Sequence, residues 1–390
     1  MKEVKDIYCR RCGNKEDTLF KKSKKGIYCV KCQRFGKYYL DNNNEKVFKT
    51  NTFNEANYEL PYALTSKQQR CAEDVVMYIK KKEDVLVYAA CGAGKTEMSM
   101  PLITYALESG LKIGIAIPRK DVVIELGVRY QEAFPKIKVV EVYGDHHNEI
   151  DGDLIIMTTH QLYRYEKVFD VLIIDEVDAF PFAGNEILEN MVDYACKGNK
   201  VYLTATPSSK IKDMVKKGVI KQVALFVRPH GGKLCIPKVV IGFDWYLYVH
   251  MLRFFKKYKS KIILLFVPTK TLAYKMHRVL SLFRKTCVVT SESENRELLN
   301  IQIKNHEYDV VVCTTVLERG ITIPDVQVIV FDATHPVFNE AALIQISGRV
   351  GRKEYAKEGE CMLLCKKKSK VVDSVIESLE MMNDEQMCNM

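Results

Sequence analysis

The stretch from Val85 to Thr96 constrains the fold of this chain more than any other. An apolar, β-branched run predicts a buried strand up to Ala89, and a helical pattern starts at Lys95. The glycines between them let backbone N–H groups approach phosphate oxygens in front of a helix N-terminus. Lys95 is placed to reach the outer phosphates, and Thr96 to put its hydroxyl on Mg²⁺. This context predicts nucleotide binding, although Ala89 replaces the first glycine of the pattern G-x-x-x-x-G-K-[ST]. Without the context, Gly-Ala-Gly-Lys-Thr would be compatible with a chance turn.

Strand-like runs alternate with helical stretches along most of the chain. Continuous apolar strands separated by amphipathic helices predict parallel sheets that are covered on both faces. The first series of predicted strands is Val85–Ala89, Ile113–Pro118, Val139–Tyr143, Leu154–Thr159, Val171–Asp175 and Val201–Thr206. The second series, which has no Gly-Lys-Thr loop, is Lys261–Val267, Thr286–Thr290, Val310–Thr315, Val326–Asp332 and Gly359–Leu364. Residues 207–260 are interpreted as a transition between two lobes, with Trp245 in a core. The predicted fold class is therefore α/β, with two doubly wound parallel-sheet lobes.

A second key stretch ends the strand at Val171–Asp175 with the acids of Asp175-Glu176-Val177-Asp178. A buried strand delivers such acids at the carboxyl edge of its sheet, where ligands bind in these folds. Asp175 would hold Mg²⁺, and Glu176 would orient and deprotonate an attacking water. The alternative is a solvated acidic turn. Thr204 and Thr206 close the next strand, and their hydroxyls are candidates for relaying the nucleotide state to a neighbouring domain.

Two arginines three residues apart follow a helix that begins near Asn339, in Gln345-Ile-Ser-Gly-Arg349-Val-Gly-Arg352. They stand among glycines on a lobe without a phosphate loop. We interpret Arg349 and Arg352 as donors to a nucleotide on the facing lobe, where they would neutralise charge that develops on the γ-phosphate. As isolated residues they would be ordinary surface charges.

Four cysteines near the N-terminus have the spacing of two metal-binding knuckles. Cys9 and Cys12 are separated by two residues, as are Cys29 and Cys32, and sixteen residues lie between the pairs. Such knuckles place four thiolates around one Zn²⁺. Two disulfides are the alternative in an oxidising compartment, but nothing in the sequence indicates secretion. A basic segment of this size has too little core to fold confidently alone, so we expect a structural metal.

The charge of the chain is concentrated in this segment. The formal net charge is +10, and residues 1–58 hold 14 Lys and Arg against 7 Asp and Glu. Lys21, Lys22, Lys24 and Lys25 are surrounded by aromatic residues, a composition that suits phosphate neutralisation and base stacking on single strands. The alternatives are that the charge only keeps the protein soluble and that the aromatic residues are the core of the small module.

The sequence contains no candidate for a membrane span or a secretion signal. No apolar run approaches the roughly 20 residues needed to cross a bilayer. The start, Met-Lys-Glu-Val-Lys-Asp, is charged where a signal peptide would be apolar. Most of the 13 cysteines stand singly in strand-like or helical contexts, unlike a disulfide framework. We therefore expect a cytosolic protein.

In order, these motifs resemble the pattern of superfamily 2 helicases over most of residues 60–360. The motifs are Gly92-Ala-Gly-Lys-Thr96, Asp175-Glu-Val-Asp178, Thr204-Ala-Thr206 and Gln345-x-x-Gly-Arg-x-Gly-Arg352. With a four-cysteine module ahead of the motor, the chain resembles the ComFA family, the late-competence ATPases of naturally transformable Gram-positive bacteria. The resemblance implies two RecA-like lobes, at 59–228 (ATP-binding) and 229–390 (helicase C-terminal), after a zinc-binding module at 1–58.

The resemblance also implies an activity and its partners. The chain would hydrolyse ATP with Mg²⁺ when single-stranded DNA is bound, helping to draw incoming DNA through the membrane channel. Its implied partners are single-stranded DNA, the phosphoribosyltransferase-like protein ComFC and the uptake channel machinery. It would lie in the cytoplasm at the inner face of the membrane without a span of its own, as a possible oligomer.

Residue roles carried over by motif complete these expectations. Gln68 would recognise adenine beside the phosphate-binding residues Gly92, Ala93, Gly94, Lys95 and Thr96. Catalysis would fall to Lys95, Asp175, Glu176, Arg349 and Arg352, with Mg²⁺ on Thr96 and Asp175. Coupling would use Thr204, Thr206 and Gln345, and the DNA track would include Pro118, Arg119, Thr159, His160 and Thr315. Ile346 departs from the wider superfamily, in which this position is often basic. The departure leaves open whether strands are separated or only translocated.

Two other functions are compatible with parts of the sequence. A primosomal replication-restart helicase has similar motor motifs, but that family carries its cysteines in the carboxy-terminal half and a separate DNA-binding domain ahead of the motor. A nucleotide-gated DNA-binding scaffold would need no hydrolytic acid, so Glu176 and the two arginines argue against it.

Overall fold

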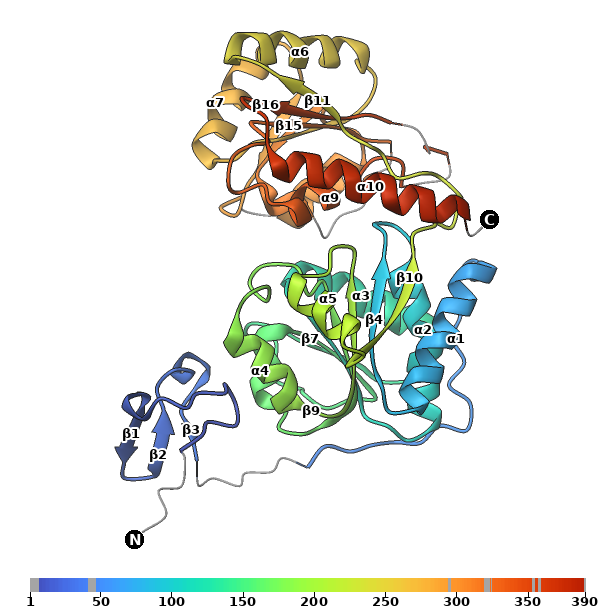
Figure 1. Cartoon of the computed structure of the whole chain (residues 1–390), viewed down its shortest axis with the longest axis vertical. Helices are drawn as coiled ribbons and strands as arrows, with labels where there is room; N and C mark the ends of the chain where they lie inside the picture. The colour runs from blue at the N-terminus through green and yellow to red at the C-terminus, as the bar shows by residue number, and fades with distance from the viewer. Residues whose placement is uncertain are drawn as a thin grey trace. The chain divides into compact units, whose positions relative to one another are not determined.

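The computed structural model of the chain (Figure 1) describes residues 7–40, 47–293, 296–318, 323, 325–352, 355–356 and 359–388. The chain divides into two compact units. The first comprises Met1–Tyr88 and Lys95–Ala224, and the second comprises Ala89–Gly94 and Leu225–Met390.

The first unit is built on a seven-stranded sheet with the order β10-β4-β9-β8-β5-β7-β6. The pairs from β4 to β6 are all parallel. The strands are β4 (Asp84–Ala89), β5 (Ile113–Ile117), β6 (Val139–Val142), β7 (Leu154–Thr158), β8 (Phe169–Asp175), β9 (Cys196–Thr204) and β10 (Ile220–Leu225). Every residue of β5 and β7 is buried, as expected for central parallel strands.

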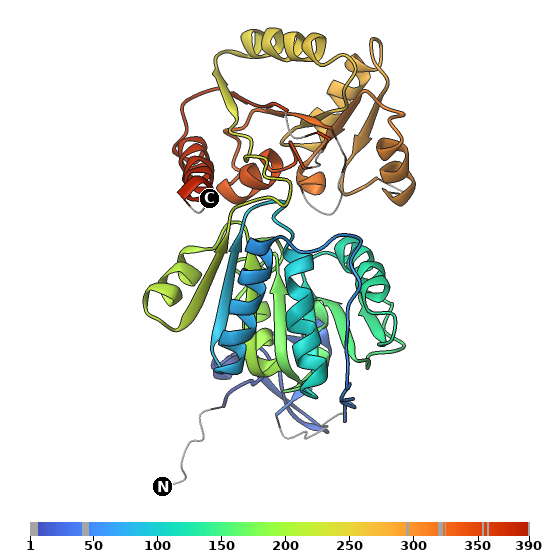
Figure 2. The ribbon, with the colours of Figure 1, turned by 90° about the vertical axis from the view of Figure 1, so that its right-hand side faces the viewer.

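Helices cover this sheet on both faces. They are α1 (Ser66–Lys80), α2 (Lys95–Glu108), α3 (Lys120–Ala133), α4 (Glu186–Ala195), α5 (Ser209–Lys216) and the 3₁₀ turn η3 (Thr159–Arg164). The helices α1 and α2 lie side by side on one face (Figure 2). The first of them begins with a capping box, in which the Thr65 hydroxyl accepts from the N–H of Gln68.

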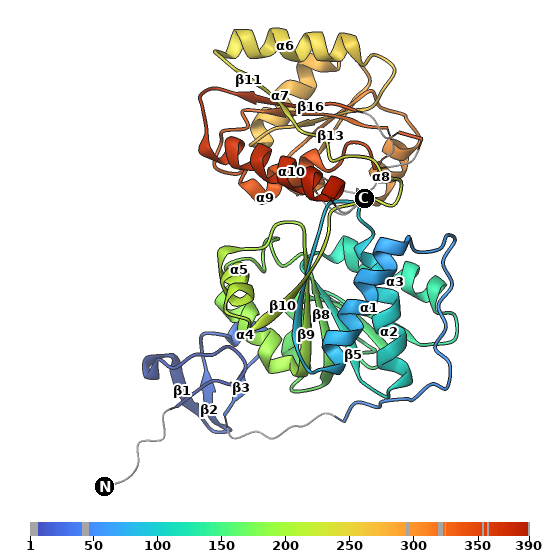
Figure 3. The same cartoon turned by 45° about the vertical axis from the view of Figure 1, so that its right-hand side comes forward.

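The second unit contains a wholly parallel six-stranded sheet with the order β11-β16-β15-β12-β14-β13. Its strands are β11 (Lys238–Ile241), β12 (Ile263–Phe266), β13 (Thr286–Val289), β14 (Val310–Cys313), β15 (Gln327–Phe331) and β16 (Cys361–Cys365). Its helices are α6 (Asp244–Lys257), α7 (Lys270–Leu280), α8 (Arg296–Lys304), α9 (Glu340–Ser347), α10 (Lys370–Cys388) and the turn η4 (Thr315–Leu317). The sheet lies between α6 and α7 on one side and α9 and α10 on the other (Figure 3).

A small antiparallel sheet precedes the first lobe and belongs to the first unit. It consists of β1 (Phe20–Ser23), β2 (Gly26–Cys29) and β3 (Tyr38–Tyr39), with the 3₁₀ turns η1 (Asp17–Leu19) and η2 (Gln33–Phe35). Its buried cysteines share one core cluster with residues of η3 and α4, including Leu162, Leu188 and Met191. The small sheet is thus packed against the lobe.

The predicted fold class is confirmed: two parallel α/β sheets are preceded by a small four-cysteine module. All eleven predicted strands are present, although β9 begins at Cys196 rather than Val201. The boundary between the two units, after Ala224, lies within residues 207–260, which agrees with their interpretation as a transition between lobes. These residues also form the helix α6, together with α5, β10 and β11, which were not predicted. The prediction for Trp245 is wrong, since 68% of this residue is exposed on α6.

Among the helices of the described ranges, none is both long and apolar enough to span a membrane.

A tight contact between β8 and β9 yields a prediction about stability. A Cβ added to Gly198 would lie 2.1 Å from the carbonyl oxygen of Asp170, at the irregularity in this strand pair. Main chain inside a sheet cannot move aside without loss of pairing. We expect Gly198→Ala to lower the free energy of unfolding by about 1–3 kcal/mol, measured by denaturant titration.

The neighbouring Lys197→Ala substitution is the control. Its ammonium lies 3.3 Å from Asp170, and its side chain is 47% exposed. Removing such a surface ion pair costs about 0–1 kcal/mol. An equal effect of both substitutions would contradict the steric explanation.

Candidate nucleotide site and zinc centre

The phosphate loop has the backbone that the sequence predicts. The strand β4 ends at Ala89 and α2 begins at Lys95. Gly92 and Gly94 have φ angles of +81° and +87°, which side-chain-bearing residues rarely adopt. Between them, the N–H of Ala93 donates to the carbonyl of Ala90 at 3.1 Å. The loop therefore turns sharply into a helix N-terminus, which is a favourable place for an anion.

A lysine and an acid meet at the carboxyl edge of the first sheet. The Nζ of Lys95 lies 3.9 Å from Oδ1 of Asp175, and both side chains are mostly buried. Burial raises the pKa of Asp175 to about 6, while the charge of Lys95 opposes this rise and that of Glu176 adds to it. Glu176 itself has φ +54°, an uncommon conformation for its residue type, and its N–H donates to Oδ1 of Asp175 at 2.8 Å.

The predicted coupling threonines contact the acidic motif directly. The hydroxyl of Thr204 donates to Oδ1 of Asp178 at 2.6 Å, and that of Thr206 donates to Oδ2 at 2.5 Å. The N–H of Thr206 also donates to the Thr204 hydroxyl at 2.9 Å. One carboxylate thus ties the end of β9 to the turn that follows β8. The role of Asp178 in this bond was not predicted from the sequence.

Gln68 is buried at the start of α1, where its amide oxygen accepts from the N–H and the hydroxyl of Thr65. The residues predicted to follow the DNA track lie at the carboxyl ends of strands. Pro118 and Arg119 follow β5, and Thr159 and His160 begin η3 after β7. Pro118 and Thr159 are buried, whereas Arg119 and His160 are partly exposed. In the second unit, Thr315 begins η4 after β14.

The two predicted arginines of the second unit follow α9. Arg349 is buried, and its Nε donates to the carbonyl of Glu318 at 3.2 Å. The Nε of Arg352 donates to the carbonyl of Gly348 at 2.9 Å. Gln345, on α9, accepts from the thiol of Cys91 at 3.1 Å within the same unit.

A third arginine in this unit was not predicted. Arg228 is fully buried, and its guanidinium donates to the carbonyls of Cys91, Gly348, Val350 and Gly351 at 2.7–3.1 Å. Burial, together with the nearby charge of Arg352, lowers the pKa of Arg228 to about 10. In the sequence, Arg228 is simply the residue before Pro229, and no motif there indicates these contacts.

The four predicted cysteines form one cluster. All are fully buried, and their sulfur atoms lie within 4.8 Å of one another. The Sγ atoms of Cys9 and Cys32 are 3.8 Å apart, and those of Cys12 and Cys29 are 3.6 Å apart. A tetrahedral zinc with Zn–S bonds of about 2.3 Å has sulfur–sulfur edges of about 3.8 Å. Disulfide sulfurs would be about 2.05 Å apart, so the cluster fits zinc and not two disulfides.

Arg11, between two of these cysteines, completes the centre and was also missed. It is buried, and its Nε and Nη2 lie 3.3 and 3.1 Å from Sγ of Cys32. It also donates to the carbonyls of Cys32, Phe35 and Gly36. Hydrogen bonds from Cys12 and Cys9, together with the charge and hydrogen bond of Arg11, lower the pKa of Cys32. A thiolate is the form that binds zinc.

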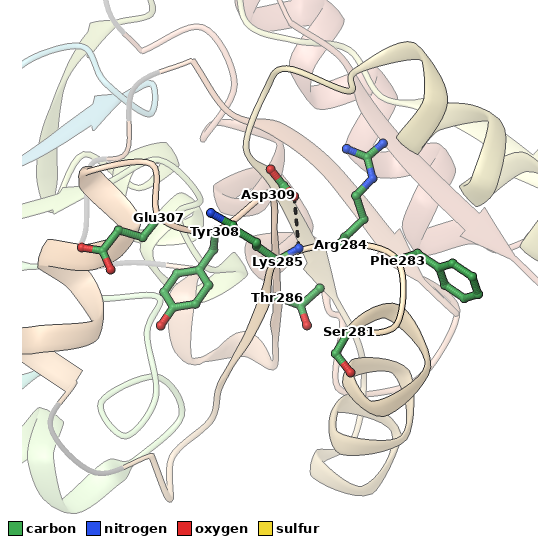
Figure 4. Close-up of a pocket in the computed structure, with 8 residues that line it drawn as sticks. All are labelled: Ser281, Phe283, Arg284, Lys285, Thr286, Glu307, Tyr308 and Asp309. Carbon is green, nitrogen blue, oxygen red and sulfur yellow. Dashed lines mark hydrogen bonds between the residues drawn. The ribbon is translucent and has the colours of Figure 1, made fainter.

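A surface hollow of about 580 Å³ lies in the second unit (Figure 4). Lys285 and Asp309, which line it, immediately precede β13 and β14, and the N–H of Lys285 donates to the Asp309 carboxylate. The hollow therefore lies at the amino ends of the strands, whereas ligands of such sheets bind at the carboxyl ends.

Comparison with known proteins identifies the family. Residues 61–209 match the family described as type III restriction enzyme, res subunit, and residues 247–354 match the helicase conserved C-terminal domain. The chain is 35% identical to competence protein ComFA of Bacillus subtilis (strain 168), over 89% of this chain and 80% of that protein. The chain belongs to the ComFA family. Competence protein ComFA of Streptococcus pneumoniae is 33% identical, over 83% of this chain and 78% of the relative.

Solved structures share the fold of this ComFA relative at low identity. Saccharomyces cerevisiae Dbp5 bound to RNA and ADP BeF3 has a TM-score of 0.60 at 16% identity, over 82% of this chain and 92% of that chain. Mycobacterium smegmatis helicase Lhr bound to ssDNA and AMP-PNP also has a TM-score of 0.60 at 16% identity, over 83% and 49% of the two chains. The resemblance to superfamily 2 helicases is thus confirmed, and the helicase domains imply ATPase activity.

The cysteine cluster predicts a metal-dependent fold of the small module. We expect Cys29→Ser to reduce the zinc content from about one ion per chain to well below one, because three thiolates hold zinc less tightly, and to unfold the module. Zinc content by atomic emission and proteolysis of the N-terminal segment would measure both effects.

The matched control is Cys235→Ser, a cysteine of the second unit outside the cluster. It should retain its zinc. A Cys29→Ser protein that still carried one zinc per chain would show that the ligand set is wrong.

Proposed function

We propose that this ComFA-family chain is an ATPase that is stimulated by single-stranded DNA and translocates along it during DNA uptake in competence. The observation that best supports this proposal is the linked arrangement at the carboxyl edge of the first sheet. There Lys95 faces Asp175, and Asp178 of the same acidic motif binds both threonines at the end of β9. The residues proposed for ATP hydrolysis and those proposed for coupling would thereby be connected through the turn that follows β8.

The residues present fit a nucleotide and a divalent cation. The left-handed glycines and the start of α2 suit phosphate, and Lys95 supplies a cation beside it. Thr96 and Asp175 would hold Mg²⁺, with Gln68 near the adenine. Bound Mg²⁺ would supply neutralisation of the phosphate charge.

Glu176 is proposed to orient and deprotonate the attacking water, with Arg349 and Arg352 neutralising charge that develops on the γ-phosphate. A change in the phosphate charge beside Asp175 would alter the electrostatic field at Asp178, two residues beyond Glu176. Because Asp178 is bonded to Thr204 and Thr206, that change would reach the end of β9. Gln345 would have the corresponding coupling role in the second lobe.

The DNA track is proposed to include Pro118, Arg119, Thr159, His160 and Thr315. We also propose that the chain is divided into a module at 1–58 and lobes at 59–228 and 229–390. We further propose that it associates with ComFC and with the uptake channel at the inner face of the membrane. Membership of the ComFA family supports this proposal over the primosomal alternative.

The experiment that tests the proposal is ATP turnover by the purified chain with single-stranded, duplex or no DNA, at two salt concentrations. We expect strong stimulation by single strands that weakens as salt rises, because phosphate contacts release counterions. Lys95→Ala should abolish turnover and leave DNA binding by the zinc module intact. Equal turnover in all conditions would contradict the proposed DNA dependence.

The scaffold alternative has its own test. We expect Glu176→Gln to reduce turnover by at least 100-fold, because it removes the proposed base, and to abolish DNA uptake in transformation assays. The variant should bind ATP as the unchanged chain does. If it supported normal transformation without turnover, the scaffold would replace the motor.

A further inference from the structure

The zinc module is packed onto η3, the turn that carries His160. The ring of Phe35, in η2 of the module, lies 6.0 Å from the ring of His160 and 5.8 Å from that of Tyr163. The guanidinium of Arg11 lies over the same Tyr163 ring at 6.0 Å. The module is therefore in direct contact with a turn that sequence motifs alone assign to DNA.

Further contacts fix the module against the rest of the first unit. The hydroxyl of Tyr38 donates to Glu166 at 3.4 Å, and Lys31 pairs with Glu186 at 3.2 Å. A Cβ added to Gly13 would lie 2.7 Å from the side chain of Asn190, so the first knuckle also packs closely on α4. The module thus contacts the rest of the first unit at three further points.

Positively charged side chains of the module and of η3 stack on aromatic rings. The guanidinium of Arg34 lies 4.7 Å from the Phe35 ring centre, and Lys37 lies 4.8 Å from that of Tyr28. On η3, Arg164 lies 4.8 Å from the ring of Tyr163. Arg34 is close enough to His160 that its charge contributes, after burial, to lowering the pKa of that histidine.

Acidic groups near the junction are already engaged. Glu166 accepts from the hydroxyls of Tyr38 and Tyr194, and Glu186 is paired with Lys31. Within residues 7–40 there are ten Lys and Arg against Glu16 and Asp17 alone. Among the described residues, no ion pair engages Arg34, Lys37 or Arg164. The surface thus offers cations beside aromatic faces, which is the composition that binds a single-stranded nucleic acid.

We infer that the zinc module and η3 form one continuous binding surface for single-stranded DNA, which passes from His160 and Arg164 onto Arg34 and Lys37. The inference rests on the proposed function and extends it, because it makes the module part of the track. Phe35 is a positioning residue in this surface, since it holds the two halves together. The module would lengthen the stretch of DNA bound by the first unit.

Binding of oligothymidylates of increasing length, from about 6 to about 30 nucleotides, tests this extension. Fluorescence anisotropy on the full chain without ATP would compare the unchanged protein with Arg34→Glu/Lys37→Glu. We expect equal affinity for the shortest strands and, for the longest, roughly tenfold weaker binding by the variant. For long strands, the slope of log Kd against the logarithm of the salt concentration should be smaller in the variant by roughly 1 to 1.5, as expected for two lost phosphate contacts.

The matched control is Lys212→Glu/Lys216→Glu on α5, which makes the same change in net charge at exposed positions of the same unit. It should bind all lengths as the unchanged chain does. Phe35→Ala is a second variant, expected to keep one zinc per chain and to lose the gain in affinity with length. If Phe35→Ala loses its zinc, the charge-reversed pair still decides the question.

Two results would overturn the inference. One is a variant pair that binds strands of every length as tightly as the unchanged chain does, and the other is an equal loss for the pair and the α5 control. Because binding is measured without ATP, these results are separate from DNA-stimulated turnover. If single-stranded DNA stimulated ATP turnover normally but the variant showed no length-dependent loss of affinity, the extended track would be wrong and the proposed function would be unaffected.

Discussion

Parallel pairing of β4, β9 and β8 is the constraint on which the nucleotide chemistry of this chain depends. Because the three strands run in one direction, the phosphate loop, the threonines and the acids all emerge at one edge of the sheet. The strand β9 lies between the other two, so Thr204 is paired with Tyr88 of β4 while its hydroxyl bonds Asp178 beyond β8. A shift of either β4 or the acidic turn after β8 would therefore alter the position of these threonines.

Unfavourable local features are concentrated at this edge. Asp175 is a mostly buried carboxylate whose pKa is raised to about 6 by burial, and the next residue, Glu176, has a left-handed backbone. Each feature costs stability, and neither improves the packing of the core. Residues that break local rules in this way are typical of sites kept for function. Their position beside Lys95 agrees with the proposed chemistry.

The sequence predicts the central parts of this fold better than its edges. Strands such as β5 and β7 are buried on both faces, so their composition is continuously apolar and easily recognised. The edge strand β10 mixes buried and more exposed residues, and β11 has no buried residue, so neither has the continuous apolar composition of a central strand. The cluster of four cysteines follows from a local spacing in the sequence, and it was predicted correctly. Arg11 and Arg228 were not, because their acceptors come from residues distant in sequence.

Packing against the first lobe, together with a bound metal, would explain how so basic a module can be ordered. Most of its cations point to solvent, but Arg11 is buried, and a buried cation is costly unless it is paired. Four thiolates around Zn²⁺ carry a net charge of about −2, and Arg11 donates directly to one of them. The same guanidinium lies 5.2 Å from the ring of Tyr38 and 6.0 Å from that of Tyr163 on η3. Loss of the metal would remove the partner of this buried charge, and the contact with η3 would be lost with it. A bound zinc would therefore act on the first lobe through packing, although it would lie outside the proposed nucleotide chemistry.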